Sequence, residues 1–188
     1  MRVPRLLLAG APGSGKTTLV CRLAERLRAE GVVVSGFVTR EVREDGHRVG
    51  FTAEAEGRSP VLIAHVAWAE GPRVGRYRVD VTAFERVALP ALRQALHGDG
   101  VAIIDELGQM ELLSPAVIEA VERLFGREVP VVATVHLKAH PVTDAFKQRR
   151  DVELIDVGAA TQDVLLARLT RRLLAAGAGR RAGPHQAP

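Results

Sequence analysis

Cysteine and asparagine are scarce in this chain of 188 residues, and each scarcity excludes a class of protein. Cys21 is the single cysteine, so no disulfide can form within the chain, and a reducing cytoplasm is the expected location. Asparagine is absent, which excludes the asparagine-containing motif that reads guanine in Ras-like switch GTPases. No apolar run approaches the roughly 20 residues that cross a bilayer, so no membrane-spanning segment is expected.

Lysine is also scarce, and the basic residues that remain are unevenly placed. The chain carries a net charge of +4, and residues 164–188 contain five arginines and no acid, so residues 1–163 together carry −1. Because the excess charge belongs to the last helical pattern and a Gly/Ala/Pro-rich end, we expect a domain over residues 1–176 and a disordered tail over 177–188. A solvated tail is favoured over a nucleic-acid or membrane patch, so nucleic acid is not an expected partner.

Short apolar stretches alternate with helical patterns along most of the chain. This alternation predicts an α/β fold with a mostly parallel sheet covered by helices on both faces. Residues 32–81 differ, because strand-like runs follow one another around the turn signal EDG at 44–46 and predict an antiparallel extension. Thr82 with Glu85 has capping-box spacing for one helix, and Ser114 before Pro115 marks the start of another. The expected parallel strands cover 6–10, 101–105, 129–135 and 152–157, and the expected helices cover 15–29, 82–97, 114–125, 143–150 and 161–175.

Residues 10–17, GAPGSGKT, match the phosphate-binding pattern GxxxxGK[ST] between a predicted strand and a predicted helix. Glycines allow backbone N–H groups to converge on phosphate oxygens at the positive end of a helix dipole. Lys16 is the only lysine before residue 138, which indicates a need for a compact ammonium where this chain otherwise uses arginine. The predicted nucleotide-binding residues of this loop are Gly10, Ala11, Pro12, Gly13, Ser14, Gly15, Lys16, Thr17 and Thr18. Lys16 is also predicted to be catalytic, because it should reach the β- and γ-phosphates.

The stretch VAIIDELGQME, residues 101–111, ends an apolar strand with two adjacent acids. Two carboxylates at the edge of an apolar sheet need positive charge nearby, and Lys16 with Mg²⁺ would supply it. We therefore predict that Asp105 and the hydroxyl of Thr17 hold Mg²⁺, and that both acids belong to the nucleotide site. Glu106 is predicted to accept a proton from an attacking water, with pairing to a nearby arginine as the alternative. Glu111 is left open between a supporting role in the site and simple exposure to solvent.

Residues 138–151 carry several basic side chains between two predicted strands. They could form a short lid over the phosphates or a solvated basic helix end, and the pattern favours neither. His136 and His140 have i, i+4 spacing, but Pro141 and the preceding strand argue against a helix that would carry both to a metal.

Five stretches together resemble one known family: GAPGSGKTTL, GFVTREVRE, VGRYRVD, FERVALPALR and IIDELGQMEL. They are similar to the P-loop nucleoside-triphosphatases that include the vertebrate cancer-related nucleoside-triphosphatase and members from archaea and bacteria, over about residues 5–157. The resemblance implies a Rossmann-like P-loop fold and slow Mg²⁺-dependent hydrolysis of ATP, GTP, CTP and UTP with little base selectivity. The family pattern also has an arginine followed by an acid where Arg150 and Asp151 stand, which implies a catalytic role for Arg150.

Two other functions fit the same motifs. A nucleotide, nucleoside or polynucleotide kinase would use the same loop and Mg²⁺, but it needs a second pocket for the phosphate acceptor. A nucleotide-dependent regulatory protein would use the triphosphate to control a partner, which the sequence does not identify. Glu106 directly after Asp105 favours water as the acceptor and therefore hydrolysis.

Overall fold

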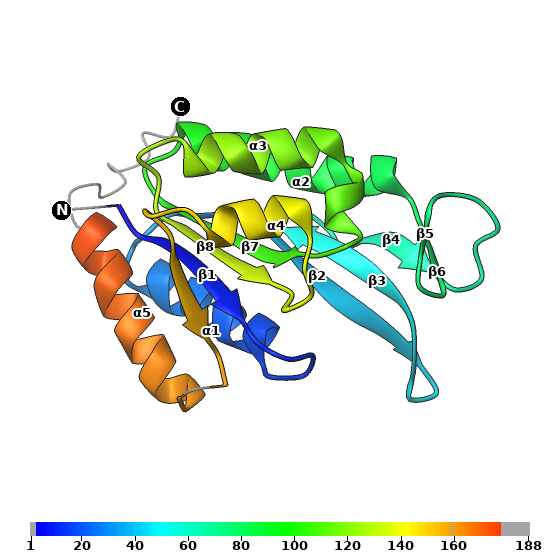
Figure 1. Ribbon diagram of the computed structural model, residues 1–188, viewed down its shortest axis with the longest axis horizontal. Helices are drawn as coiled ribbons and strands as arrows, with labels where there is room; N and C mark the ends of the chain where they lie inside the picture. The colour runs from blue at the N-terminus through cyan, green and yellow to red at the C-terminus, as the bar shows by residue number, and fades with distance from the viewer. Residues whose placement is uncertain (1–2, 159, 178–188) are drawn as a thin grey trace.

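The structure, a computed structural model, describes residues 3–158 and 160–177. In these residues nine strands form one sheet in the order β5-β6-β4-β3-β2-β7-β8-β1-β9, flanked by helices (Figure 1). The strands are β1 (Arg5–Ala9), β2 (Val34–Glu44), β3 (His47–Ala55), β4 (Val61–His65), β5 (Arg73–Val74), β6 (Tyr77–Val79), β7 (Val101–Leu107), β8 (Val131–Val135) and β9 (Glu153–Asp156). The helices are α1 (Lys16–Ala29), α2 (Val81–His97), the 3₁₀ turn η1 (Glu111–Leu113), α3 (Pro115–Phe125), α4 (Pro141–Lys147) and α5 (Gln162–Gly177).

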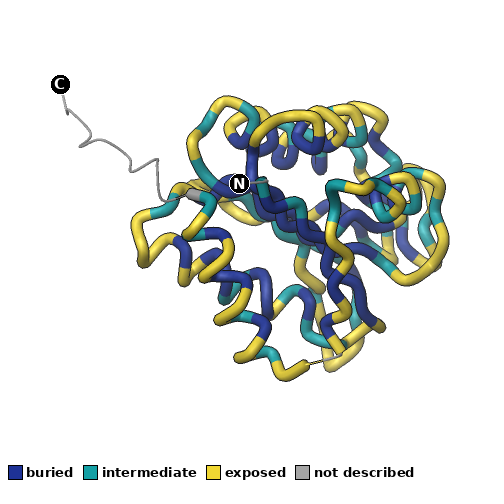
Figure 2. Tube along the Cα trace, turned by 60° about the vertical axis from the view of Figure 1, so that its left-hand side comes forward, coloured by how far each residue is buried: buried dark blue, intermediate teal, exposed yellow. Residues whose placement is uncertain are grey.

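Alternating side chains of the central strands form two hydrophobic cores, one on each face of the sheet. On one face Leu7 and Ile104 pack with α2, α3 and Phe146 of α4. On the other face Leu6 and Ile103 pack with α1 and α5. Figure 2 shows the buried strands as a dark band between partly exposed helices. This two-sided burial explains why the central strands read as continuous apolar runs, and it confirms the predicted α/β fold.

The predicted antiparallel extension is confirmed, although it is part of the main sheet. Strands β3, β4, β6 and β5 continue antiparallel from β2. The first half of β2, Val34 to Val38, instead pairs in parallel with β7. Residues 32–81 therefore do not form a separate unit, since one long strand belongs to both parts of the sheet (Figure 1).

The helix boundaries correct one expectation and confirm another. Thr82 is not the cap of α2, because the Asp80 carboxylate accepts a hydrogen bond from the Ala83 N–H at 2.8 Å and caps the helix. Glu85 instead accepts a hydrogen bond from the Ser114 hydroxyl at 2.6 Å, which joins α2 to the start of α3. Ser114 caps α3 as predicted, through the Val117 N–H.

Helix α5 ends at Gly177, the first residue of the tail predicted over 177–188, and the rest of that tail lies outside the described residues. None of the described helices combines the length and apolarity that a bilayer span requires.

Gly36 provides a test of the junction between the two parts of the sheet. Its φ is 120°, and a Cβ at this position would lie 1.9 Å from the carbonyl oxygen of Ile103 on β7. Gly36→Ala should therefore lower the free energy of unfolding by about 3 kcal/mol or more, measured by urea denaturation. Gly57 is the matched control, because it also has a positive φ but no atom lies within 4 Å of the added Cβ. Gly57→Ala should cost about 1 kcal/mol, and equal losses in the two variants would contradict this account of the junction.

Candidate active site

The carboxyl ends of β1, β7 and β8 meet at one edge of the sheet, because these strands are parallel and adjacent. The phosphate-loop sequence follows β1, the acid pair lies near the end of β7, and His136 follows β8. In parallel α/β sheets, ligands bind at this edge. The fold thus brings together residues from three distant parts of the chain.

The loop at residues 10–15 has the backbone of a phosphate-binding loop. Gly13 and Gly15 have φ values of 78° and 85°, which glycine adopts most readily, and α1 begins at Lys16 directly after Gly15. Lys16 is buried, and its Nζ donates hydrogen bonds to the carbonyl oxygens of Gly10 at 2.9 Å and Ala11 at 3.2 Å. Residues 11–13 and Thr18 are exposed at the mouth of the site. The loop therefore presents its backbone and a helix N-terminus to an incoming anion.

Asp105 is almost fully buried, and only one of its two carboxylate oxygens has a hydrogen-bond partner among the described residues. Its Oδ1 accepts a hydrogen bond from the Thr134 hydroxyl at 2.5 Å, whereas its Oδ2 is buried with no hydrogen-bond partner among the described residues. Burial raises the pKa of Asp105, and the nearby hydroxyls of Thr134 and Thr17 and the charge of Lys16 oppose the rise. Mg²⁺ prefers oxygen ligands. Asp105 Oδ2, which lacks a hydrogen-bond partner among these residues, and the nearby hydroxyl of Thr17 therefore suit this ion.

No cluster of three or more His, Cys, Asp or Glu side chains within residues 3–158 and 160–177 has a metal-binding arrangement. The candidate Mg²⁺ ligands are therefore one carboxylate and one hydroxyl, Asp105 and Thr17. This sparse set is typical of Mg²⁺ sites that share their coordination with substrate phosphates and water.

Glu106 points toward a histidine instead of an arginine. His136 Nε2 lies 2.6 Å from Glu106 Oε1, and the two side chains are 38% and 21% exposed. Burial raises the pKa of Glu106, while the charges of His136 and Lys16 lower it and the charge of Asp105 raises it further. This pair holds one carboxylate oxygen and leaves the other available at the edge of the sheet.

Strand β2 lies beside β7 on the side opposite β8, and it also contacts Asp105. Thr39 donates a hydrogen bond from its hydroxyl to the backbone carbonyl of Asp105 at 3.1 Å. Thr134 on β8 binds the Asp105 side chain, as described above. The two strands next to β7 therefore both fix Asp105.

Glu111 is buried, which decides the question left open by the sequence. Its side chain lies in η1, and its Oε2 accepts a hydrogen bond from the Gly108 N–H at 3.1 Å. Burial is the main cause that raises its pKa to about 8, and the charges of Glu106 and Asp105 add to the rise. At pH 7 this carboxyl group is therefore mostly protonated.

Arg150 does not reach the site in this conformation. It is exposed and makes no hydrogen bond or ion pair with the described residues. Arg149 binds Asp151 and the Phe125 carbonyl, and Lys147 pairs with Asp144 at 2.9 Å. Helix α4, Pro141–Lys147, is shorter and starts earlier than the predicted helix over 143–150. The basic segment therefore lies against its own neighbours, and the structure does not bring Arg150 to the acids.

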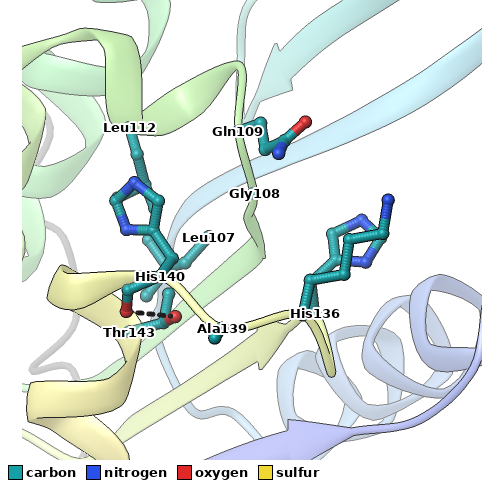
Figure 3. Close-up of a pocket in the computed structure, with 9 residues that line it drawn as sticks. Leu107, Gly108, Gln109, Leu112, His136, Ala139, His140 and Thr143 are labelled. Atoms are coloured by element: carbon teal, nitrogen blue, oxygen red, sulfur yellow. Dashed lines mark hydrogen bonds between the residues drawn. The ribbon is translucent and has the colours of Figure 1, made fainter. Parts of the chain in front are cut away.

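A small cavity of about 60 Å³ lies beside the acid pair (Figure 3). The turn after β7 forms one wall with Leu107, Gly108, Gln109 and Leu112, and the segment after β8 forms the other wall with His136, Lys138, Ala139, His140 and Thr143. His140 accepts a hydrogen bond from the Val142 N–H and caps α4, so it serves a role different from that of His136. The two histidines therefore have different partners, Glu106 for His136 and the Val142 N–H for His140.

Comparison with known proteins identifies the family. Residues 5–170 match the protein family described as NTPase. The nucleoside-triphosphatase THEP1 of Thermofilum pendens is 41% identical over 177 residues, which are 92% of this chain and 97% of that protein. The human cancer-related nucleoside-triphosphatase is 36% identical over 174 residues, covering 86% of this chain and 92% of that protein. The chain belongs to the NTPase family.

A solved structure supports this membership. The crystal structure of THEP1 from the hyperthermophile Aquifex aeolicus superimposes with a TM-score of 0.80 at 33% identity, covering 90% of this chain and 98% of that one. The resemblance found in the sequence motifs is therefore confirmed at the level of family and fold.

Sequence reasoning missed the residues that support the acids. His136 was considered only as a metal ligand, and Thr39 and Thr134 were not singled out. One signal was available, because polar residues at the ends of adjacent parallel strands must lie together. That signal required the order of the strands, which the sequence pattern does not specify.

The buried Glu111 predicts a pH-dependent difference in stability. Between about pH 4.5 and pH 8 the folded chain retains a proton on Glu111 that the unfolded chain has lost, so raising the pH favours unfolding. Glu111→Gln removes this proton equilibrium. Its free energy of unfolding should therefore match the wild type near pH 4.5 and exceed it by on the order of a few kcal/mol near pH 8. Thermal unfolding of both proteins from pH 4.5 to 9 tests this, and a difference that does not grow with pH would refute it.

Proposed function

We propose that this chain hydrolyses nucleoside triphosphates to nucleoside diphosphate and phosphate, with Mg²⁺ and with little selection among ATP, GTP, CTP and UTP. The observation that carries the proposal is the half-satisfied Asp105, which lies beside Thr17 and next to Glu106 at the edge that bears the phosphate loop. Membership in the NTPase family supports the reaction class. The relatives are named nucleoside-triphosphatases without reference to one base, which supports little selection among the four.

Binding of the triphosphate falls to the loop of residues 10–18. The N–H groups of the loop and the N-terminus of α1 stabilise the phosphate oxygens, and Lys16 leaves the carbonyls of Gly10 and Ala11 to contact the β- and γ-phosphates. Thr17 and Asp105 Oδ2 would hold Mg²⁺, which neutralises charge on the phosphates when bound.

Glu106 performs the proton transfer in this proposal. His136 donates a hydrogen bond to Glu106 Oε1, which orients the carboxylate and leaves Oε2 to accept a proton from water. The water oxygen bonds to the γ-phosphorus as the bond from that phosphorus to the β–γ bridging oxygen breaks. Phosphate and the nucleoside diphosphate then leave the site.

We further propose a cytoplasmic location. Cys21 is the single cysteine of the chain, so no disulfide can form within it, which suits a reducing compartment. We place the domain boundary near residue 176, with nucleoside triphosphates as the partners of residues 1–176.

Phosphate release from ATP, GTP, CTP and UTP with Mg²⁺ and no acceptor tests the reaction. The wild type should release phosphate from all four, and Glu106→Gln should slow release about 100-fold or more while nucleotide binding persists. Glu119→Gln is the matched control, because Glu119 lies on α3 in an exposed pair with Arg123. Failure of the wild type to release phosphate from any of the four would reject hydrolysis and direct the search to kinase acceptors.

Arg150 is proposed to stabilise charge in the transition state after the segment that carries it moves toward the phosphates. Arg150→Ala should then lower kcat by roughly 100- to 1,000-fold, whereas KM should change little. Arg127→Ala is the control, since Arg127 is exposed just after α3, near the opposite edge of the sheet. Equal kcat values for Arg150→Ala and the wild type would exclude Arg150 from the reaction.

A further inference from the structure

The mechanism above does not use Glu111, yet this residue occupies a costly position. It is 6% exposed, and none of the described residues forms an ion pair with it. Burying a carboxyl group without a cation is unfavourable, so a specific interaction is expected to account for its presence. The Gly108 N–H provides such an interaction, together with the N–H of Glu111 itself.

Gly108 lies between the carboxyl groups of Glu106 and Glu111. A Cβ on Gly108 would lie 2.9 Å from Glu111 Oε2 and 3.0 Å from Glu106 Oε1. Because both carboxyl oxygens lie within 3.0 Å of the same point, the carboxyl groups of Glu106 and Glu111 are close together at Gly108. The Gly108 carbonyl also accepts a hydrogen bond from the Leu112 N–H at 3.1 Å, so both backbone groups of Gly108 are held by the turn.

The backbone at Glu106 receives less support from the sheet than the rest of β7. Pairing of β7 with β8 is regular up to Ile104, opposite Ala133, and resumes only at Leu107, opposite Val135. The ladder of β7 with β2 ends at Asp105, opposite Val38. Glu106 therefore lies where neither ladder is regular, and its direction depends on the turn that follows.

We propose that Glu111 is a positioning residue for the hydrolysis: by holding the Gly108 N–H, it fixes the turn at residues 107–112 and thereby directs Glu106 toward the phosphate loop. This inference rests on the proposed function. The same turn forms one wall of the cavity opposite His136, the partner of Glu106 (Figure 3). Glu111 thus acts on the reaction through Gly108 and does not touch the substrate.

The protonation of Glu111 agrees with this role. The charges of Asp105 and Glu106 on β7 act on Glu111, Lys16 and His136 act on Glu106, and Lys138 lies across the cavity from the turn. Burial and the two neighbouring acids keep Glu111 protonated at neutral pH, so it does not add a third negative charge to the site. A neutral side chain with the same shape and a carbonyl acceptor should therefore replace it.

Three substitutions distinguish positioning from other roles. Glu111→Gln keeps an acceptor for the Gly108 N–H, and its kcat should stay within about threefold of the wild type. Glu111→Ala removes the acceptor, and its kcat should fall about 100-fold with KM changed by less than about threefold, as expected for a misplaced catalytic group. Glu111→Asp is one methylene shorter and should resemble Glu111→Ala; it replaces that variant if Glu111→Ala does not fold.

Glu119→Gln is the matched control, because it makes the same change of acid to amide at an exposed position on α3, and it should retain the wild-type kcat. Wild-type kcat in Glu111→Ala would overturn the proposal. A loss in Glu111→Gln as large as in Glu111→Ala would also overturn it, because an ionised carboxylate would then be required.

Amide hydrogen exchange at Gly108 separates this inference from the proposed function. Protection of this amide should persist in Glu111→Gln and fall at least tenfold in Glu111→Ala or Glu111→Asp, whether or not the protein hydrolyses any triphosphate. Unchanged protection in the shortened variants would overturn the positioning role. Absence of phosphate release from the wild type, with the expected change in protection, would instead overturn the proposed function alone.

Discussion

The concentration of negative charge at the carboxyl end of β7 is the constraint on which the site depends. Asp105 and Glu106 on β7 and Glu111 in η1 are close in sequence. Their surroundings disfavour ionised carboxylates. Each of the three acids has different neighbours. Threonine hydroxyls and Lys16 act on Asp105, His136 pairs with Glu106, and Glu111 is buried beside two acids so that it retains its proton.

These different environments match different chemical roles. Asp105 has an oxygen without a hydrogen-bond partner among the described residues, which suits a cation, and Glu106 has one oxygen held and one available, which suits proton transfer. Glu111, protonated and enclosed, is suited to hold the backbone and poorly suited to either of those tasks. The functions proposed for these three chemically similar side chains thus differ because of burial and because of the neighbours that each strand supplies.

The sheet supplies those neighbours because of its strand order. Placing β8 between β1 and β7 puts Thr134 and His136 beside the acids, and β2 adds Thr39 from the other side. Strand β2 also carries the antiparallel extension, so the part of the sheet furthest from β1 connects directly to the acid pair. The close packing of Gly36 against Ile103 makes this connection possible.

Local sequence patterns by themselves determined the α/β class, the phosphate loop and the two acids. Alternating apolar strands and helices, a glycine loop before a lysine, and adjacent carboxylates after a strand are all features of neighbouring residues. Only the tertiary structure decided that His136 is the partner of Glu106, that Asp80 caps α2, and that Glu111 is buried. These outcomes depend on which strands lie side by side and on how one turn folds back on itself. Hydrogen bonding and desolvation act through space, so the order of residues along the chain does not specify them.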